Sequence, residues 1–448
     1  MQIKYSFIVP TLNEELYLES TLQSLSGFKN YEIIISDGGS VDGTLEIAER
    51  FNAKIVNSEP GRGIQLNNGI QSSSGEILCF LHADTSLPQN AFERVEEYFQ
   101  NNKYKICRFK LGFDVDHSLL NGYKLFSKYD TMYTRFGDMF IAARRDFVNE
   151  IGSFPNWKIF EDVAFLNKAS KRSKIFVLNE EVISSARTFI KYGLISQQLF
   201  NISSFIKYLA GARRFIENGT YYNRKMKKTD TSVILFVKYP LEAKVKTRLA
   251  ETIGNKKAVN IYSLLAENVV RNIQRLKNTY NYIFYSEESE KEKIKNWIKG
   301  SFFYSPQKGN GLGARMSNAF KLVFGHGAEK ALIIGTDIPD LSTEIINDAI
   351  KKLHEYDVVI GPSPDGGYYL LGMKKFTPEL FENITYSTNT VFEDTIKKIK
   401  DKKQSYTTLE TLEDIDTESE LTNWLNGSKE TQLKKEISKI YFEEKYER

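Results

Sequence analysis

The chain has 448 residues, which is too long for one ordinary hydrophobic core and predicts two or three domains. Hydrophobic residues make up 41% and charged residues 26%, as in soluble globular proteins, and a net charge of +4 predicts no nucleic-acid partner. The well-separated Cys79 and Cys107 form no CxxC pair, and no apolar run approaches the roughly 20 residues of a membrane span, so we expect a cytoplasmic protein.

The first half alternates short β-rich apolar runs with helical patterns, which favours parallel βα units. A helix is expected over Glu14–Leu25, where Leu18, Leu22 and Leu25 keep one face apolar. The expected strands are Tyr5–Val9, Tyr31–Ser36, Lys54–Ser58 and Glu76–Leu81. We therefore expect one α/β domain over residues 1–221.

Polar motifs follow the first two expected strands. Pro10, Thr11, Asn13 and Glu14 come directly after the first strand, where Asn13 and Glu14 can cap the next helix or face a ligand. Asp37 opens the run DGGSVDGT after the second strand. That run is either a plain glycine turn or a place where Asp37 accepts hydrogen bonds from a base or ribose.

Two further motifs have the chemistry that a nucleotide diphosphate needs. Arg62 stands between glycines at a helix start, as a diphosphate contact or as an ordinary loop arginine. Asp84 follows the fourth strand, within His82-Ala83-Asp84. A carboxylate at a strand end can hold the divalent cation that a diphosphate leaving group requires.

Later motifs of the first half supply an acid pair and an amphipathic segment. Glu161 and Asp162 stand at a helix start, either as favourable charges for the helix dipole or as the general base for an acceptor hydroxyl, with Asp162 favoured. Ile195–Glu217 keeps an apolar stripe beside Arg213 and Arg214. A helix packed on the protein is favoured there, and a peripheral helix on the inner face of the membrane, near a lipid acceptor, stays open.

In this order and spacing, the motifs resemble the GT-A glycosyltransferases of family 2 over residues 3–220. The resemblance implies inverting sugar transfer from an NDP-sugar to a hydroxyl of a small-molecule or lipid acceptor, with Mg²⁺ or Mn²⁺. It implies that Thr11, Glu14 and Asp37 contact the nucleoside and that Asp84 binds the metal. His82 replaces the first acid of the usual DxD motif and could itself be a ligand.

The same resemblance places Pro10, Asn13, Arg62 and Asp138 in the nucleotide-sugar site. It makes Glu161-Asp162 the counterpart of the ED motif that supplies the base. The QxxRW motif is absent, and Arg187 is the candidate for a comparable place. The run LHADT at residues 81–85 resembles a subgroup often found near radical-SAM, selenium or arsenosugar genes.

The pattern changes at residues 222–230 (YNRKMKKTD), a basic polar run that predicts a linker. A second α/β domain is expected over residues 231–428, and residues 429–448 resemble a charged surface helix. The elements expected in it are a helix around Lys256–Lys277 and strands Val233–Lys238, Tyr280–Ser286, Ala331–Gly335 and Asp357–Pro362.

Motifs of the second half predict another phosphate site. Lys244, Lys246 and Arg248 form either a polyphosphate grip or a solvated basic face. Asp337 follows a strand, as Asp84 does, and could hold a metal. The other candidates are Arg315, Asp365, Gly366 and Gly367. Asp414 and Asp416 are expected to cap a helix rather than to bind a ligand.

Three motifs of this half, KVKTRL, GTDIPDL and DGGYYLLG, resemble a GT-A-like family of formerly unknown function over residues 231–420. That family is similar in fold to the molybdenum-cofactor and coenzyme F420 nucleotidyltransferases. The chain is therefore expected to be α/β with two tandem GT-A (nucleotide-diphospho-sugar transferase, Rossmann-like) domains. The second could transfer glycosyl groups, make the NDP-sugar as a nucleotidyltransferase, or be a silent binding module.

Overall fold

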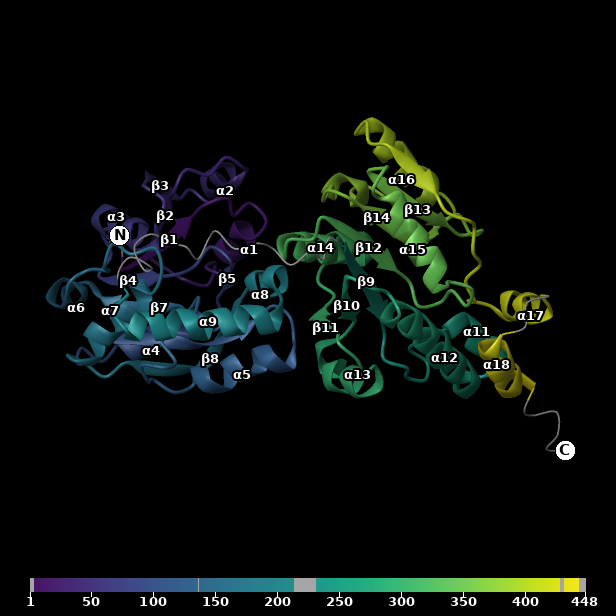
Figure 1. The fold of residues 1–448 in the computed structure, drawn as a ribbon, viewed down its shortest axis with the longest axis horizontal. Helices are drawn as coiled ribbons and strands as arrows, with labels where there is room; N and C mark the ends of the chain where they lie inside the picture. Colours follow the sequence, from purple (N-terminus) through teal and green to yellow (C-terminus); the bar gives the residue numbers. More distant parts are fainter. Residues whose placement is uncertain (1–3, 136, 213–230, 428–430, 443–448) are drawn as a thin grey trace. The chain divides into compact units, whose positions relative to one another are not determined.

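The computed structural model describes residues 4–135, 137–212, 231–427 and 431–442 (Figure 1). The chain divides into two compact units, Met1–Lys227 (unit 1) and Lys228–Arg448 (unit 2). Each unit has its own sheet and its own hydrophobic core. The linker expected at residues 222–230 lies outside the described residues.

Unit 1 is built on an eight-stranded sheet in the order β3-β2-β1-β4-β7-β6-β8-β5. Its strands are β1 (Tyr5–Thr11), β2 (Tyr31–Asp37), β3 (Lys54–Asn57), β4 (Ile77–Phe80), β5 (Thr85–Ser86), β6 (Ile106–Phe113), β7 (Ile141–Arg144) and β8 (Phe176–Ser184). The central strands β3, β2, β1 and β4 are parallel, but β7 runs antiparallel to β4 and β6. The prediction of parallel βα units is therefore wrong for β7.

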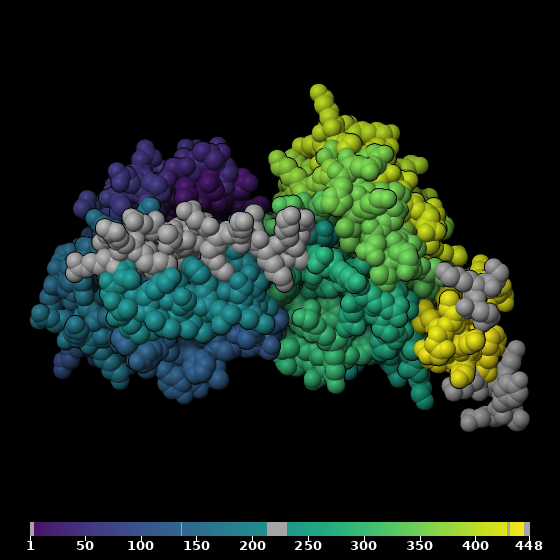
Figure 2. Space-filling model, viewed as in Figure 1, coloured from purple at the N-terminus to yellow at the C-terminus, as the bar shows by residue number. Residues whose placement is uncertain are grey.

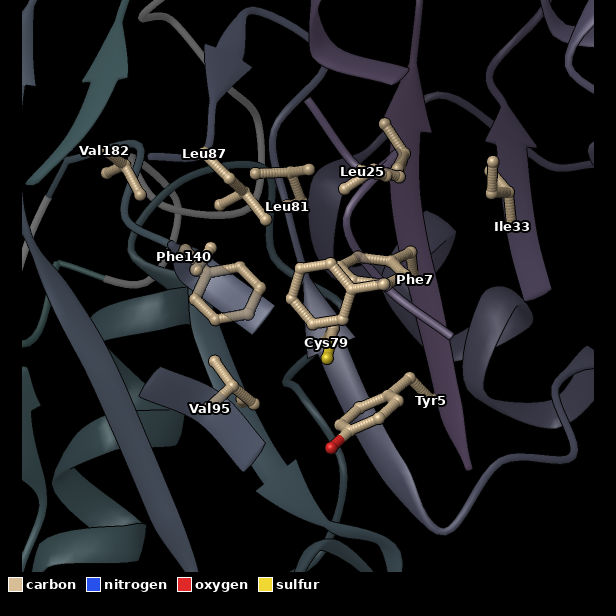
Figure 3. Close-up of a cluster of buried hydrophobic side chains, with 14 of the residues drawn as sticks. Tyr5, Phe7, Leu25, Ile33, Cys79, Leu81, Leu87, Val95, Phe140 and Val182 are labelled. Carbon is tan, nitrogen blue, oxygen red and sulfur yellow. The ribbon is translucent and has the colours of Figure 1, made fainter. Parts of the chain in front are cut away.

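Helices cover both faces of this sheet because its central strands bury both of their faces. They are α1 (Leu18–Gln23), α2 (Thr44–Arg50), α3 (Arg62–Ser72), α4 (Ala91–Phe99), α5 (Ser118–Ser127), α6 (Arg145–Ile151), α7 (Glu161–Ser170), α8 (Arg187–Tyr192) and α9 (Leu194–Leu209). Phe7 and Val9 of β1 belong to one core cluster, and Ile8 belongs to the cluster on the other face. Figure 3 shows the first cluster, where Phe7, Cys79 and Phe140 meet.

Two expected helices of unit 1 differ from the structure. The helix predicted over Glu14–Leu25 spans only Leu18–Gln23, and residues 15–17 before it form a turn. Helix α9 was expected to pack its apolar stripe on the protein. Leu199, Ile202, Ile206 and Leu209 are exposed, so the stripe does not pack on unit 1, and its packing on the second domain stays a prediction. Residues 213–217 of that segment, with Arg213 and Arg214, lie outside the described residues.

Unit 2 is built on a seven-stranded sheet in the order β11-β10-β9-β12-β14-β13-β15. Its strands are β9 (Thr231–Val237), β10 (Thr279–Tyr285), β11 (Phe303–Pro306), β12 (Lys330–Ile334), β13 (Val358–Pro362), β14 (Tyr368–Met373) and β15 (Tyr406–Thr408). Strand β14 runs antiparallel to β12 and β13. The short connection from Pro362 to Tyr368 permits only an antiparallel hairpin, so the parallel prediction fails here too.

The helices of unit 2 include two short 3-10 helices, η2 (Glu288–Glu290) and η3 (Pro378–Phe381). The α-helices are α11 (Thr247–Ile253), α12 (Asn255–Gln274), α13 (Lys291–Trp297), α14 (Gly311–Gly325), α15 (Thr343–Lys352), α16 (Val391–Asp401), α17 (Glu418–Asn426) and α18 (Gln432–Phe442). The charged C-terminal helix is α18, which buries Leu433 and Ile437 in a cluster with α12. One side of α18 is therefore packed on unit 2, although the sequence suggested a charged helix at the surface.

The two sheets share one topology. When β9 is matched with β1, the other strands of unit 2 follow the order β3-β2-β1-β4-β7-β6-β8. The directions also agree, because β12 and β14 are antiparallel as β4 and β7 are, and β13 and β15 are parallel as β6 and β8 are. Loops that follow matched strands can therefore be compared directly between the units.

Candidate active sites

The loop after β2 is held by the carboxylate of Asp37, which is 3% exposed. Asp37 accepts hydrogen bonds from Thr11 Oγ1 (2.9 Å) and Ser40 Oγ (2.5 Å), and from the backbone N–H groups of Gly39 (2.9 Å) and Ser40 (2.8 Å). Burial raises the pKa of Asp37, but these four donors outweigh it and leave the pKa below its usual range. In this conformation Asp37 organises the loop, and its oxygens are already engaged.

Arg187 lies at the centre of the acidic site of unit 1. Its guanidinium binds both carboxylate oxygens of Glu14, at 2.8 and 2.6 Å, and its Nη2 lies 2.9 Å from Asp84 Oδ2. Burial raises the pKa of Asp84 to about 7, against the opposing effect of Arg187. The loops after β1, β4 and β8 therefore meet at one cation.

A second group of charges surrounds Asp138. Arg62 Nη2 lies 3.2 Å from Asp138 Oδ1, and His82 Nδ1 lies 3.5 Å from the same oxygen. Burial raises the pKa of Asp138, but Arg62 and His82 outweigh it and lower the pKa. Burial lowers the pKa of His82 to about 4, so its imidazole is neutral at physiological pH. Arg62, Asp84 and Asp138, which the sequence predicts separately, come together here.

The acid pair begins α7, as the sequence predicts. Phe160, the residue before it, has a left-handed φ of 62°, which turns the chain sharply into the helix. Glu161 is 1% exposed and its Oε2 has no hydrogen-bond partner, whereas Asp162 is half-buried. Burial raises the pKa of Glu161 to about 8 and that of Asp162 to about 7. Asp162 is thus the more accessible of the two acids.

His82 and the acid pair Glu161 and Asp162 line one small, mostly apolar pocket together with Pro10. Carboxylate and imidazole are suitable donors for a divalent cation, so Asp84 with His82 and Asp138 fits such an ion chemically. Arg187 already occupies Asp84 Oδ2, and among the described residues no three His, Cys, Asp or Glu side chains are gathered as a metal site. A cation at Asp84 must share that carboxylate with Arg187.

The corresponding place in unit 2 is built around Lys246, whose side chain is 3% exposed. Its Nζ lies 3.0 Å from Asp337 Oδ2 and 2.6 Å from Asp416 Oδ1. Burial lowers the pKa of Lys246, but the two carboxylates outweigh it and raise the pKa. Lys246 adopts a left-handed φ of 48°. It is therefore a buried ion-pair centre, and the alternative of a solvated basic face is wrong for it.

The acidic turn before α17 belongs to this site. The cap of α17 is Thr417, whose hydroxyl accepts the N–H of Glu420 while Glu420 binds back to the backbone of Thr417. The prediction that Asp414 and Asp416 cap the helix is therefore wrong. Asp416 binds Lys246, and burial together with Asp416 and Asp365 raises the pKa of Asp414 to about 6.

The remaining candidates of unit 2 are more dispersed. Lys244 and Arg248 are exposed on either side of Lys246, so the three cations do not point to one place. Arg315 donates to the backbone oxygen of Gly311 (3.2 Å). Asp365 closes the β13–β14 hairpin by accepting the hydroxyl of Ser363 (2.6 Å) and the N–H of Gly367 (2.9 Å).

Gly366 has a structural reason for its identity. Its φ is 85°, and a Cβ added there would lie 2.0 Å from the backbone oxygen of Asn389. Only glycine permits this approach of two backbone segments. The flexibility of Gly366 therefore serves the packing of the hairpin, and the structure does not need a ligand to explain it.

Matched loops of the two units carry exchanged charges. After β1 stands the acid Glu14, whereas the loop after β9 supplies the cation Lys246. After β8 stands the cation Arg187, whereas the loop after β15 supplies the acid Asp416. Asp84 after β4 and Asp337 after β12 keep the same sign. Each site thus has one cation between two carboxylates. In unit 1 the cation comes from the loop after β8, whereas in unit 2 it comes from the loop after β9, which matches β1.

The sequence analysis assigned Asp416 and Asp414 wrongly, as helix caps. The contact with Lys246 joins residues 170 positions apart, which no local spacing reveals. The available signal was Thr417 followed by Glu420, since this pattern assigns the helix cap to Thr417 and frees Asp416.

Comparisons with known proteins agree with two different domains. The model of glycosyl transferase family 2 matches residues 6–145. The model of a family described as an uncharacterized protein conserved in bacteria (DUF2064) matches residues 269–388. The first match ends before Glu161, Asp162 and Arg187.

Two curated relatives carry the same indication. The glycosyltransferase AglE of Haloferax volcanii is 28% identical over 201 residues, which are 40% of this chain and 65% of AglE. The minor teichoic acid biosynthesis protein GgaA of Bacillus subtilis is 33% identical over 114 residues, 22% of this chain and 26% of GgaA. The chain thus spans less than two thirds of the length of either relative.

A solved structure is also similar, that of a protein assigned as a nucleotide-diphospho-sugar transferase from Desulfovibrio desulfuricans G20. It is 31% identical, with 48% of this chain and 97% of that chain covered and a TM-score of 0.45. The expected α/β class with two Rossmann-like sheets is confirmed. The chain thus joins a glycosyl transferase family 2 domain in unit 1 to a domain of the uncharacterized bacterial family in unit 2.

Proposed function

We propose that unit 1 transfers a sugar from an NDP-sugar to a hydroxyl acceptor with inversion. The observation that carries this proposal is the gathering of Asp84, Asp138, Glu161 and Asp162 around Arg62 and Arg187 at one edge of the sheet. Ligands of open α/β sheets bind at this edge. A site of this kind offers both cations for a diphosphate and an accessible acid beside them.

In the proposed reaction Asp162 accepts the proton of the acceptor hydroxyl. The acceptor oxygen then bonds to the anomeric carbon while the bond from that carbon to the diphosphate breaks, and the nucleoside diphosphate leaves with the electron pair. Arg62 and Arg187 lie where their charges can stabilise the leaving diphosphate. Burial, with the charge of Asp138 nearby, keeps the pKa of Asp162 high.

A divalent cation, Mg²⁺ or Mn²⁺, is part of this proposal. Asp84 would hold it, with His82 and Asp138 beside it, and the ion would neutralise charge on the diphosphate. Arg187 then holds Glu14 and the shared carboxylate in position. The family resemblance extends the proposal to arsenosugars or related small-molecule glycosides as products.

The test is a panel of NDP-sugars, each with Mg²⁺ or Mn²⁺, added to the full-length protein. One donor is expected to raise the melting temperature and to be hydrolysed slowly without an acceptor. Asp84→Asn should abolish the metal-dependent part of both effects, whereas Asp146→Asn, on the exposed side of α6, should change neither. Lack of any donor-dependent stabilisation across the panel would refute the proposal.

For unit 2 we propose a second nucleotide-sugar transferase site, with Lys246 as the phosphate-directed cation between Asp337 and Asp416. Either glycosyl transfer or nucleotidyl transfer suits this site, and the second would supply the donor that unit 1 consumes. Asp337→Asn in the full-length protein should stop turnover of one such reaction, such as pyrophosphate release from an NTP and a sugar phosphate. Asp348→Asn is the matched control. Unchanged turnover in Asp337→Asn would make unit 2 a silent binding module.

A further inference from the structure

Exposed apolar side chains gather on one part of unit 1. Of the sixteen large hydrophobic side chains that are exposed among the described residues, eleven lie on α5, on the loop after it and on α9. These eleven residues, here called the apolar face, are Leu119, Leu125, Phe126, Tyr129, Met132, Tyr133, Ile195, Leu199, Ile202, Ile206 and Leu209. Single exposed apolar residues are normal on a soluble protein, but a gathered set marks an interaction site.

Helix α9 exposes apolar side chains and buries polar ones, the reverse of a usual helix in a soluble domain. Its outward stripe holds Ile195, Leu199 and Ile206, which are 68%, 63% and 59% exposed. Its inward side buries the polar residues Gln197 and Ser204, and Ser204 Oγ has no hydrogen-bond partner. The apolar stripe therefore points away from the core. This orientation is typical of a helix that lies on a membrane, with its apolar side towards the lipid.

The two helices of the apolar face belong to one surface. The hydroxyl of Tyr123 on α5 is hydrogen-bonded to Gln198 and accepts from Asn201 Nδ2 at 3.2 Å, both on α9. The ring of Tyr133 lies 6.1 Å from that of Phe205. In Figure 2 the teal atoms of α9 lie at the surface of unit 1. These contacts hold α5 and the loop after it against α9.

The charges on these segments are mostly positive, and Asp130, between Tyr129 and Met132, is bound by Arg135 at 2.7 Å. Residues 117–129 and 187–212 contain no Asp or Glu. Exposed cations on them are Lys124, Lys128, Lys191 and Lys207. Glu181 of β8 pairs with Lys124 at 2.9 Å. Lys128 and Lys191 lie beside tyrosine rings, as cations do at the boundary of a bilayer. An apolar stripe bordered by lysines is complementary to an anionic lipid surface.

The apolar face also borders the site of unit 1. The loop that carries Tyr129, Met132 and Tyr133 runs on to Asp138, and α8, which leads into α9, begins at Arg187. A molecule held in a membrane under this face therefore approaches the side of the site formed by Asp138 and Arg187.

We propose that the apolar face docks unit 1 on an anionic phospholipid bilayer, with α9 lying in the headgroup boundary and the site opening beside it. The docking itself depends only on the exposed side chains and their charges. That the acceptor is a membrane-held hydroxyl compound rests in addition on the proposed function.

The test is flotation of the full-length protein with vesicles of phosphatidylcholine alone and of phosphatidylcholine mixed equally with phosphatidylglycerol. Binding is expected only to the mixed vesicles, and salt should weaken it. Leu199→Ser and Ile206→Ser should each lower the partition coefficient about tenfold. Phe442→Ser, which removes an exposed apolar side chain of unit 2, should not change it.

Three results would overturn the docking proposal. The first is a wild-type protein that binds neither vesicle, or both equally. The second is unchanged vesicle binding in Leu199→Ser and Ile206→Ser. The third is a lower melting temperature, or a dimer that dissociates, in those variants, because the face would then be covered by this chain or by a second copy. Donor hydrolysis without vesicles, measured on the same proteins, tests the glycosyl-transfer proposal separately.

Discussion

The protonation of the two acids in the unit 1 site depends on the residues around each of them. Glu161 and Asp162 are neighbours on the first turn of α7, where burial raises both pKa values, helped by Asp162 for Glu161 and by Asp138 for Asp162. Arg62 opposes the shift but is itself bound to Asp138. A carboxyl group that ionises near neutral pH is a stronger base than an exposed one, and it is unprotonated often enough to act.

Replacement of Asp162 by Asn should therefore lower kcat by about 10²–10⁴, the usual contribution of a positioned general base. The donor should still bind, because Arg62, Asp84 and Arg187 are unchanged. In the wild type, kcat should rise with pH through the pKa of Asp162, about 7. A pH-independent kcat, or a variant that loses donor binding to the same degree as turnover, contradicts the assignment of Asp162 as the base.

Glu161 makes a prediction about stability instead. Its pKa is raised by folding from 4.5 to about 8, so its contribution to stability is present at low pH and is lost as pH rises through that range. Glu161→Gln removes the charge that has to be buried. The variant should melt above the wild type at pH 8, with the difference shrinking towards pH 5. Calorimetry across this range checks it, and a constant difference would show that Glu161 is not protonated in the fold.

The elements that carry the site depend on close approaches between backbone segments. Helix α3 begins at Arg62, and Gly63 donates its N–H to the backbone oxygen of Trp157 at 3.2 Å. A Cβ on Gly63 would lie 2.0 Å from the backbone oxygen of Pro155. The loop it would strike leads directly to Glu161 and Asp162.

We expect Gly63→Ala to destabilise unit 1 by about 1–3 kcal/mol, as overpacking does, and to impair turnover by moving the acid pair. The matched control is Gly122→Ala in α5, where a Cβ would meet nothing within 4 Å. It should be neutral or stabilise by up to ~1 kcal/mol through helix propensity. Denaturant unfolding measures both, and equal effects in the two variants would refute the steric argument.

Sequence patterns predict elements well where burial alone defines them. The apolar runs at Tyr31 and Lys54 became β2 and β3 with nearly the expected bounds, and Asp84 follows the central strand β4, as the sequence predicts. The direction of β7 could not be predicted, because an apolar run has the same composition in a parallel and in an antiparallel strand.

Other features depended on contacts far along the chain. Periodicity defined the apolar stripe of α9 but not what covers it, and the structure shows that unit 1 does not. The ion pairs of Arg187 with Glu14 and of Lys246 with Asp416 join distant loops. Such pairs are set by the tertiary fold, since no rule of spacing connects residues from separate strand ends.

Each of the two units has its own hydrophobic core clusters, and each carries one candidate site. Residues such as Leu332 on β12 are buried in the core of unit 2 alone. No helix among the described residues is long and apolar enough to cross a membrane.

Leu332→Ala should accordingly cost about 2–5 kcal/mol in the unfolding of unit 2, as cavities in cores do. The unfolding transition of unit 1, followed through donor-dependent stabilisation, should stay where it is. Scanning calorimetry with and without the donor separates the two. A single transition that shifts as a whole would show that the two cores unfold together.

The two sites place their cation and one of their acids on exchanged loops. This limits the order of substitutions by which one arrangement could have evolved into the other. If Arg187 became acidic first, three carboxylates would face one another; if Glu14 became basic first, two cations would crowd Asp84. Either step leaves buried charge without compensation and is strongly destabilising. A passage between the two arrangements must therefore go through uncharged residues. Proteins with this strand order should include intermediates that carry a neutral polar side chain at one of the two exchanged places.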